Sequence, residues 1–335
     1  HNLFSGWLTK DISPDRTHDR VISNLYGIDP TILKAKSGLP DLETIARLSP
    51  MVEWISQFSN GAIAHANFYA DRLRMSCPGP VTVTPLAYQA NHSVPPKKAR
   101  MKTFRITTLG NANSNKRISS IIRAIGGSPD LRNVAEYFVV GEARPEDCER
   151  WNREAEAQGI LRFVITGHVP SQEFAKYIAE SDVLTCLRDP VLEGGSGSVV
   201  EGLLSGRPVI VSNHGCYAEI PDSCVYKVRP QYEAEDLTVA LLEILHDERA
   251  AALKGTEGKN YATTAHSVEK YVDQLMLLAD AAVAWAPVTS VCLRLGAELA
   301  DMGVKSDDPI LPRLTQQLSS IGWKSGRHPW VGHKA

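Results

Sequence analysis

The spacing of hydrophobic and polar positions changes repeatedly along the chain, and between Thr103 and Leu245 it predicts strands and helices in regular alternation. Short apolar runs bounded by glycine, proline or polar residues predict strands at residues 104–109, 135–140, 161–166, 182–187 and 208–212. Apolar positions three or four residues apart predict helices at residues 117–125, 145–157, 171–180 and 234–245. Strands that alternate with helices predict an α/β fold with a parallel, doubly wound sheet covered on both faces.

The chain on either side of this region has a less regular pattern. Upstream, the pattern predicts helical segments at residues 42–58 and 67–74 and short strands at residues 61–65 and 81–86. Downstream, it predicts helices at residues 266–284, 291–302 and 309–321, before a glycine- and aromatic-rich end. We therefore expect three parts: an N-terminal α/β domain over residues 1–95, the sheet domain over residues 96–280, and a helical extension over residues 281–335.

The composition is ordinary for a soluble globular protein, with 335 residues, 43% of them hydrophobic and 22% charged. This length suits two domains with separate cores. The net charge of −2 gives no argument for a nucleic-acid partner, and the basic residues within 97–102 read as a solvated linker edge. The apolar run 275–295 is interrupted by Asp280, Pro287 and Arg294, which favours a packed helix over a membrane span.

The six cysteines are scattered without the spacing of a zinc site, and several fall in predicted strands. They read as buried free thiols in a reducing compartment. The histidines His65, His168 and His214 lie near the ends of predicted strands but lack metal-ligand spacing, so we interpret a lone histidine there as structural. The chain also has no phosphate-binding loop of the Gly-x4-Gly-Lys-Ser/Thr type and no Gly-x-Ser-x-Gly nucleophile elbow.

Two acids, Glu193 and Glu201, flank a glycine- and serine-rich loop at residues 194–198. The loop follows a predicted strand and opens a short helix that Gly206 and Pro208 close. The first N–H groups of a helix have no partner within the helix, so such a loop is suited to bind an anion. An anion site between two carboxylates suits a ligand with both phosphate and hydroxyl groups, and a nucleotide sugar is such a ligand.

Each acid also has a purely structural explanation. Ser198 and Glu201 have the spacing of a capping box, in which the two side chains satisfy free amides of the helix. Glu193 could be an exposed loop acid. The local sequence leaves the functional and the capping interpretations equally open.

A second candidate loop follows the first strand of the sheet domain, with Gly110 and Lys116. Glycine allows close approach of a ligand to the backbone, and a lysine at the start of the next helix could neutralise a diphosphate. The spacing Gly-x5-Lys is weak, and taken alone it favours a surface loop whose lysine faces solvent.

In combination, these motifs resemble the retaining glycosyltransferases of family 4, the glycosyl transferases group 1, which have the two-domain GT-B fold. The family pattern Glu-Gly-Phe-Gly-x4-Glu corresponds to residues 193–201, and its Ser-Gly-x-Pro-Val-Ile corresponds to residues 205–210. The family's Gly-Arg-x4-Lys corresponds to residues 110–116, and further family strands match near residues 139–141, 164–169 and 181–183. The resemblance covers about residues 50–280 and is most specific over residues 103–225.

The resemblance implies a role for each site residue. Glu201 would bind the ribose hydroxyls, Glu193 would orient the donor sugar and stabilise positive charge on it, and Lys116 would bind the diphosphate. The remaining donor-binding residues would hold phosphate or border the nucleobase: Gly110, Asn111, Gly194, Gly195, Ser196, Gly197, Ser198, His168 and Val169. The family lacks an Asp-x-Asp metal motif, so we expect no metal and no cofactor, with the nucleotide-diphosphate sugar as substrate.

Three departures from the family pattern affect this interpretation. Asn111 stands where the family has arginine, and we hypothesise that Arg188 supplies the missing charge. Gly195 replaces the family's phenylalanine, as in relatives that act on bacterial surface polysaccharides. The resemblance also implies an acceptor-side domain with roughly a hundred more residues than lie before Val94, so we expect the N-terminal domain to be partial. Either the chain is a fragment, or another chain or domain supplies the missing half.

We expect a retaining enzyme that transfers sugar from a nucleotide-diphosphate donor to a saccharide, a lipid-linked acceptor or another hydroxyl group. Its pathway would be polysaccharide or glycoconjugate biosynthesis. Its location would be cytoplasmic, or peripheral at the inner membrane face. Two alternatives stay open: a non-catalytic GT-B-like module that binds a nucleotide sugar or a partner, and a GT-B sugar-nucleotide epimerase.

Overall fold

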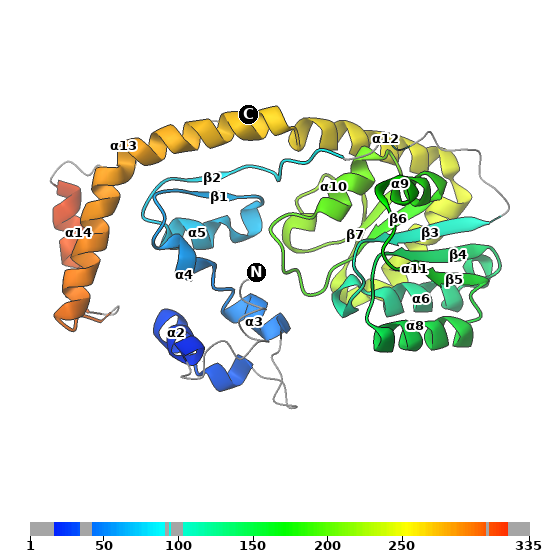
Figure 1. The fold of residues 1–335 in the computed structure, drawn as a ribbon, viewed down its shortest axis with the longest axis horizontal. Coiled ribbons are helices and arrows are strands. Elements are labelled where there is room, and N and C mark those ends of the chain that lie inside the picture. The colour runs from blue at the N-terminus through cyan, green and yellow to red at the C-terminus, as the bar shows by residue number, and fades with distance from the viewer. Residues whose placement is uncertain (1–16, 34–41, 91–93, 95–102, 306–307, 321–335) are drawn as a thin grey trace. The chain divides into compact units, whose positions relative to one another are not determined.

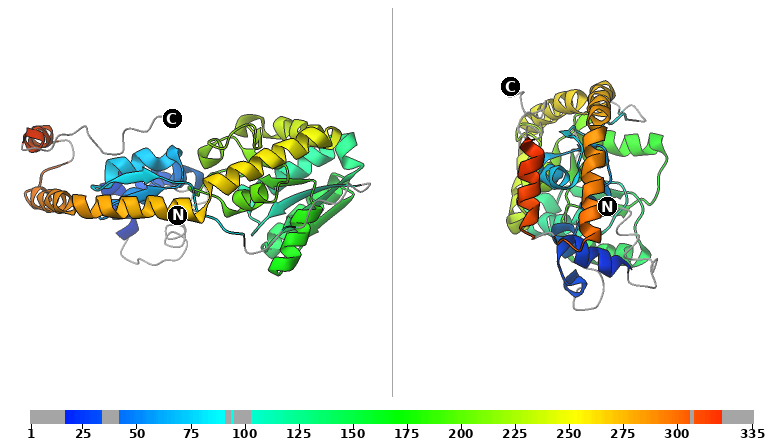
Figure 2. Two further views of the ribbon diagram at one scale, coloured as in Figure 1. Left: turned by 90° about the horizontal axis from the view of Figure 1, so that it is seen from above. Right: turned by 90° about the vertical axis from the view of Figure 1, so that its left-hand side faces the viewer.

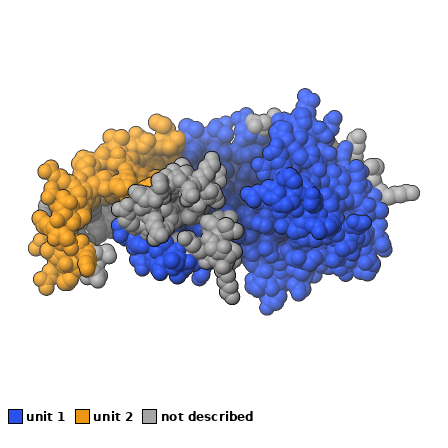
Figure 3. Space-filling view, turned by 60° about the horizontal axis from the view of Figure 1, so that its bottom comes forward, with its two compact units in different colours: residues 1–51, 65–69, 84–273 blue, residues 52–64, 70–83, 274–335 orange. Residues whose placement is uncertain are grey.

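The structure is a computed structural model that describes residues 17–33, 42–90, 94, 103–305 and 308–320 (Figure 1). The chain forms two compact units (Figure 3). Unit 1 comprises residues 1–51, 65–69 and 84–273, and unit 2 comprises residues 52–64, 70–83 and 274–335. The domain boundaries predicted at residues 95 and 280 rest on the sequence pattern, not on contacts between residues, and they stay a prediction.

The centre of unit 1 is a parallel sheet of six strands in the order β5-β4-β3-β6-β7-β8. The strands are β3 (Phe104–Leu109), β4 (Ala135–Val140), β5 (Arg162–Ile165), β6 (Val183–Cys186), β7 (Val209–Ser212) and β8 (Tyr226–Val228). The first five lie where the sequence pattern predicts strands, and β8 was not predicted. This order confirms the predicted doubly wound parallel sheet.

The strand order reverses between β3 and β6. β3 pairs with β4 along its whole length, from Phe104 opposite Ala135 to Leu109 opposite Val140. On its other side β3 pairs with β6, with Ile106 opposite Val183. In a doubly wound sheet, ligands bind beyond the carboxyl ends of the strands at this reversal. The loops after β3 and β6 are therefore where the fold places a site.

Helices cover both faces of the sheet (Figure 1). One face packs against α6 (Ile118–Gly127), α7 (Pro129–Arg132), α8 (Pro145–Ala157) and α11 (Glu233–His246). The other face packs against α9 (Ser171–Glu180), α10 (Gly197–Leu204) and α12 (Glu248–Ala265). Successive strand residues point to opposite faces, so Tyr137 joins the first core and its neighbour Phe138 joins the second. The predicted helices at residues 145–157 and 171–180 coincide with α8 and α9.

Helix α12 was not predicted, because its sequence carries little of the apolar signal that marks a helix. Its four buried positions are Ala251, Gly255, Gly258 and Ala262. Glycine and alanine at these positions let α12 approach its neighbours closely: a Cβ atom added at Gly255 would lie 2.3 Å from the carbonyl oxygen of Gly206. Small residues thus set the packing distance here, and hydrophobic periodicity does not detect them.

The N-terminal segment of unit 1 forms α2 (Thr17–Tyr26), the 3-10 helix η1 (Pro30–Leu33) and α3 (Leu42–Leu48). A small core of Ile22, Ile45 and Met51 holds them together. The predicted helix over residues 42–58 is wrong, because it divides into α3 and α4 (Val52–Ser56). Pro50 disfavours helical conformation at the preceding residue, and Met51 adopts a left-handed φ of 62°.

Unit 2 contains the parallel pair β1 (Ala62–Ala64) and β2 (Val81–Val83), with α4 and α5 (Ala70–Ser76). The 3-10 helix η2 (Asn67–Tyr69) precedes α5 and is part of unit 1. A Cβ atom at Gly79 would lie 1.9 Å from the carbonyl oxygen of Asn60, so only glycine fits where the segments that lead into β1 and β2 meet. The indole nitrogen of Trp285 donates a 3.0 Å hydrogen bond to the carbonyl of Pro78.

The chain continues as α13 (Val268–Asp301) and ends its described part with α14 (Ile310–Ser320). The separate helices predicted at residues 266–284 and 291–302 are wrong, because α13 is a single helix with Pro287 inside it. The helix bends along its length (Figure 2). Proline removes one helical N–H donor, and a helix of 34 residues retains enough other hydrogen bonds to continue past it. Helix α14 confirms the helix predicted at residues 309–321.

The helical stretch Glu248–Asp301 is long and apolar enough to cross a membrane, by length and composition alone. Core helices of soluble proteins can be equally long and apolar, but they are mostly buried. In this stretch, 11% of the most apolar 18-residue segment is buried. The six cysteines are all free, and Cys77, Cys186 and Cys224 are buried. The expected buried thiols are thus present in part, but only Cys186 lies in a strand.

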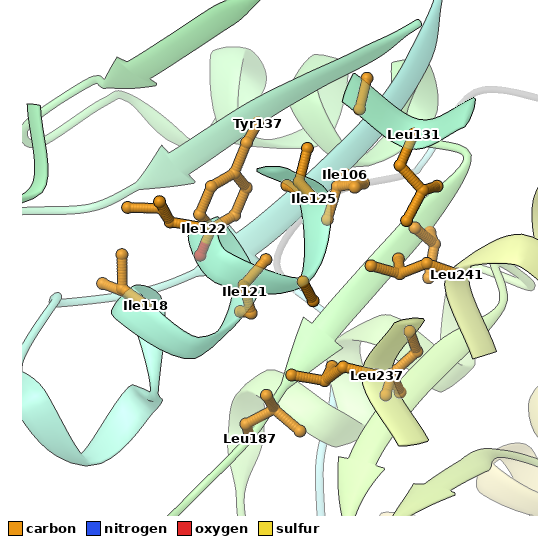
Figure 4. Close-up of a cluster of buried hydrophobic side chains, with 14 of the residues drawn as sticks. Ile106, Ile118, Ile121, Ile122, Ile125, Leu131, Tyr137, Leu187, Leu237 and Leu241 are labelled. Atoms are coloured by element: carbon orange, nitrogen blue, oxygen red, sulfur yellow. The ribbon is translucent and has the colours of Figure 1, made fainter. Parts of the chain in front are cut away.

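Truncation of Ile122 should destabilise the sheet domain. Ile122 in α6 is completely buried and lies with Ile121 and Tyr137 in the first core (Figure 4). We expect Ile122→Ala to lower the free energy of unfolding by about 2–5 kcal/mol in denaturant titration, through lost apolar burial and the cavity left behind. Val239→Ala on the exposed face of α11 is the matched control and should change it by less than about 0.5 kcal/mol. Equal effects of the two substitutions would contradict the assignment of this core.

Candidate functional site

The loop after β3 is built on two glycines from adjacent strands. Gly110 has a left-handed φ of 77°, and its N–H donates a 2.8 Å hydrogen bond to the carbonyl of Val140. A Cβ atom at Gly141, which follows β4, would lie 2.4 Å from the carbonyl carbon of Gly110. Both positions require glycine, one for its conformation and the other for space. Together they allow the loops after β3 and β4 to touch.

Lys116 does not face solvent, which rules out the surface-loop interpretation of this motif. It ends the 3-10 helix η3 (Ser114–Lys116), is 5% exposed, and its ammonium donates back to the carbonyl of Leu109. A Cβ atom at Gly110 would lie 3.1 Å from Nζ, so the glycine leaves room for the ammonium group. Burial, and then the charge of Arg188, lower the pKa of Lys116 to about 7.

Arg188 enters the same site from the end of β6. Its side chain is buried, and Nε donates a 2.9 Å hydrogen bond to Oε1 of Glu193. Its backbone N–H donates to the hydroxyl of Ser212 at 2.8 Å, which fixes the loop to β7. The backbone N–H of Asp189 donates to the carbonyl of Asn115 at 2.9 Å. This last bond joins the loop after β6 to the loop that carries Lys116.

Glu193 is held on one side and partly open on the other. Besides Arg188, the hydroxyl of Tyr217 donates a 2.6 Å hydrogen bond to the same oxygen, Oε1. Tyr217 ends the 3-10 helix η4 (Gly215–Tyr217) and is 1% exposed. Burial raises the pKa of Tyr217, so its hydroxyl stays protonated and acts as the donor. The side chain of Glu193 keeps 28% of its surface exposed and is therefore accessible to a ligand.

Helix α10 starts beside the Gly110 loop. Its N-cap is Ser196 and its first residue is Gly197. The Ser198 hydroxyl would lie 3.5 Å from a Cβ atom at Gly110, so the helix N-terminus faces the Lys116 side. Ser198 lies within the helix, one position after Gly197, so the capping box that would start at Ser198 is wrong. Glu201 is 3% exposed and accepts a hydrogen bond from the hydroxyl of Tyr88.

Two segments of unit 1 that precede the large sheet, residues 65–69 and 84–88, cover the glycine- and serine-rich loop at residues 194–198, called the glycine loop below. A Cβ atom at Gly194 would lie 2.5 Å from the ring of Tyr69, and one at Gly195 would lie 3.2 Å from Cβ of Leu86. His65 is 3.5 Å from that same Gly195 position. The space at residue 195 is therefore already filled by Leu86 and His65, which explains why glycine replaces the bulky phenylalanine of the family pattern.

The segment at residues 65–69 is fixed by the carboxylate of Glu219. This carboxylate accepts hydrogen bonds from the backbone N–H groups of Asn67 and Phe68 at 2.9 and 2.7 Å. It also accepts one from the side-chain amide of Asn67 at 2.9 Å. The ring nitrogen Nδ1 of His65 lies 3.1 Å from the carbonyl of Thr84, which links the two covering segments.

The structure thus brings most of the predicted site residues together. Their roles in binding and catalysis stay predictions. The contacts described above join Gly110, Lys116, Arg188, Glu193, Gly194, Gly195, Ser196, Gly197, Ser198 and Glu201 in one site. Asn111 is exposed beside Gly110. His168 and Val169 follow β5, which is the edge strand, and β4 separates them from β3.

Several side chains at the site were not predicted from sequence. Tyr217 follows the carboxyl end of β7, and that position in a parallel sheet is a signal that could have identified it. Tyr69 and Tyr88 lie more than a hundred residues before α10, and no local pattern marks them. His65 was interpreted as structural, and it covers the glycine loop. Among the described residues, no group of three or more His, Cys, Asp or Glu side chains could hold a metal ion.

Comparison with known proteins gives the class of this fold. The family model "Glycosyl transferases group 1" matches residues 103–247. Sucrose-phosphate synthase from Thermosynechococcus elongatus has a similar structure, with a TM-score of 0.60 at 18% identity over 79% of this chain and 66% of that one. Anabaena Alr3699/HepE, solved in complex with UDP and glucose, gives a TM-score of 0.60 at 15% identity over 72% of this chain and 70% of that one.

A third similar structure, TarM from S. aureus, has a TM-score of 0.57 at 15% identity, and the match covers 73% of this chain and 48% of TarM. No curated protein sequence matches the chain. The fold is therefore that of the GT-B glycosyltransferases. The match to the group 1 glycosyl transferase model covers residues 103–247, the region that holds the six-stranded sheet.

The buried lysine should make stability depend on pH. In the unfolded chain Lys116 has its ordinary pKa of 10.5, whereas in the folded protein the pKa is about 7. Between these values the unfolded state binds more protons, so the contribution of Lys116 to stability rises with pH. We expect the free energy of unfolding of the wild type, relative to Lys116→Met, to increase between pH 7 and pH 9.5 in denaturant titrations. A difference that is flat or falls with pH would contradict a lowered pKa.

Proposed function

We propose that this chain is a retaining, metal-independent glycosyltransferase that uses a nucleotide-diphosphate sugar as donor. The observation that carries the proposal is the convergence of two buried cations, two carboxylates and the start of α10 at the reversal point of the sheet. A nucleotide-diphosphate sugar offers phosphates to the cations and the helix amides, and hydroxyl groups to the carboxylates. The fold class and the group 1 domain over residues 103–247 support the same activity.

The diphosphate would lie among Lys116, Arg188 and the first turn of α10. Charged donors and free helix amides that are positioned before the reaction stabilise the charge that develops on a leaving phosphate. Lys116 has a pKa near 7, and a bound diphosphate would raise it and keep the ammonium charged. Arg188 would supply the second cation, which the family pattern has at the position of Asn111.

The two acids would divide the remaining work. Glu201 in α10 would accept hydrogen bonds from the ribose hydroxyls. Glu193 would orient the donor sugar and stabilise positive charge on its ring during transfer with retention. The hydrogen bonds from Arg188 and Tyr217 hold Glu193 Oε1 in place and support this role by fixing the direction of its carboxylate. His168 and Val169 after β5 would border the nucleobase.

The acceptor would be a saccharide or another hydroxyl compound, including a lipid-linked one, in polysaccharide or glycoconjugate biosynthesis. Alr3699/HepE was solved in complex with UDP and glucose, which makes UDP the first nucleotide to test here, with GDP as the alternative. We infer a cytoplasmic protein or one peripheral at the inner membrane face, without a cofactor.

Glu193→Gln tests the catalytic proposal. Glutamine keeps an oxygen that can accept from Arg188 and Tyr217, so the local structure should remain while the negative charge is lost. We expect the affinity for UDP or GDP in calorimetry to stay within about threefold, and hydrolysis or transfer of the sugar from UDP-glucose or GDP-mannose to fall by about 10²–10³-fold.

Two outcomes would contradict parts of this proposal separately. If turnover is unchanged in Glu193→Gln, the carboxylate has no catalytic role. If the wild type binds nucleotide but transfers no sugar and hydrolyses no donor, the chain is a nucleotide-sugar-binding module. Absence of binding to both UDP and GDP contradicts the proposed function altogether.

Arg188 is tested by comparing alanine and lysine at this position. We expect Arg188→Ala to weaken UDP-glucose binding by at least about tenfold, since a charge-assisted hydrogen bond is lost. Arg188→Lys keeps the charge and should recover part of the affinity. Arg153→Ala on the exposed side of α8 is the control for a general change in charge. Unchanged donor affinity and turnover in Arg188→Ala would overturn the idea that Arg188 replaces the family arginine.

A further inference from the structure

Tyr88 makes a contact at the proposed donor site that the family pattern does not predict. It lies in the non-regular segment that follows β2, 113 residues before Glu201. Its hydroxyl donates a hydrogen bond to Oε2 of Glu201, whose carboxylate is almost completely buried. The proposed ribose-binding acid therefore already accepts an O–H group from the protein itself.

The backbone around Tyr88 holds this side chain in position. The N–H of Tyr88 donates a 3.0 Å hydrogen bond to the carbonyl of His266, the residue that caps the end of α12. The ring nitrogen Nδ1 of His266 lies 2.7 Å from the carbonyl of Leu86. Leu86 in turn packs over Gly195. The segment is thus attached on both sides of residue 87, and Tyr88 is aimed at α10 by these attachments.

The ring of Tyr88 also occupies space at the helix N-terminus. A Cβ atom at Gly197, the first residue of α10, would lie 3.2 Å from Cε2 of Tyr88. Burial raises the pKa of Tyr88, and the hydrogen bond to Glu201 raises it further, so the phenol stays protonated at neutral pH. The hydroxyl is therefore a donor whenever the Glu201 carboxylate is ionised.

A phenol and a ribose hydroxyl make the same demand on a carboxylate. Both donate an O–H hydrogen bond, and a ribose that offers two hydroxyl groups to one carboxylate uses both of its oxygens. Tyr88 already uses Oε2. A carboxylate oxygen can accept two hydrogen bonds, but Glu201 is only 3% exposed, so a ribose hydroxyl reaches Oε2 by taking the place of the Tyr88 hydroxyl. The tyrosine ring also stands beside the amides proposed for the phosphate.

We propose that Tyr88 is a built-in competitor of the donor ribose, which must displace the Tyr88 hydroxyl from Glu201 in order to bind. This inference rests on the proposed function, because it takes Glu201 as the ribose-binding acid. In consequence Tyr88 sets the affinity for the nucleotide part of the donor. It favours nucleotides whose ribose hydroxyls can replace the hydrogen bond between Tyr88 and Glu201. It is a specificity residue that acts on binding, and it takes no part in the transfer of the sugar.

The test is a comparison of wild type and Tyr88→Phe in calorimetric titrations with UDP and GDP, each beside its 2′,3′-dideoxy counterpart. Phenylalanine keeps the ring and removes only the competing hydroxyl. We expect Tyr88→Phe to bind the ribonucleotide about three- to tenfold more tightly, the effect of one hydrogen bond that no longer has to be broken. The dideoxy nucleotide has no hydroxyl to place on Glu201, so its affinity should be the same in both proteins. Tyr177→Phe on α9 is the matched control and should change neither affinity.

The outcomes separate this inference from the function on which it rests. Weaker ribonucleotide binding by Tyr88→Phe would show that Tyr88 supports Glu201, and would overturn the competition. An equal gain for ribo- and dideoxynucleotides would assign the effect to the space beside Gly197 instead of Glu201, and would also overturn it. Unchanged affinities with normal binding by the wild type would overturn the competition alone. Absence of UDP and GDP binding in both proteins would overturn the proposed function together with this inference.

Discussion

The close approach of backbone segments at the carboxyl end of β3 is the constraint on which the site depends. Gly110 and Gly141 let the loops after β3 and β4 touch, and the bond from Asp189 to Asn115 attaches the loop after β6. The sheet topology brings these strand ends together, and the absence of side chains at the two glycines keeps them close. A larger residue at position 141 would separate the loops and move Lys116 away from α10.

The buried positive charges in the site lower the stability of the folded protein. Lys116 and Arg188 are both buried and repel each other, which is why the pKa of Lys116 falls. Glu193 forms an ion pair with Arg188, so the positive charge of Lys116 is less well neutralised than that of Arg188. A dianionic ligand would compensate both cations at once. The same burial that destabilises the charged lysine also strengthens its attraction for such a ligand, because the local dielectric constant is low.

Sequence pattern predicted the central sheet well because buried parallel strands appear as short apolar runs between turn residues. Glu193, Glu201 and Lys116 were singled out because they lie near glycine-rich loops after strands, but the local pattern alone did not decide their function. Only the family resemblance gave them roles, and those roles stay predictions. Helix α12 was missed because alanine and glycine form its buried side, and the continuity of α13 was missed because Pro287 suggested a break. Tyr69 and Tyr88 could not be found, since their role depends on contacts across more than a hundred residues.

The cover over the glycine loop has a practical consequence for dividing this chain. Residues 65–69 and 84–88 precede the sheet domain in sequence, yet they supply the side chains against which Gly194, Gly195 and Gly197 pack. An expression boundary at residue 96 would keep all six strands of the large sheet and remove Tyr69, Leu86 and Tyr88. The resulting protein would expose Gly194, Gly195 and Gly197 to water, and the carboxylate of Glu201 would gain solvent in place of a phenol. Crystallisation or screening of that fragment would describe a different site from the one in the longer chain.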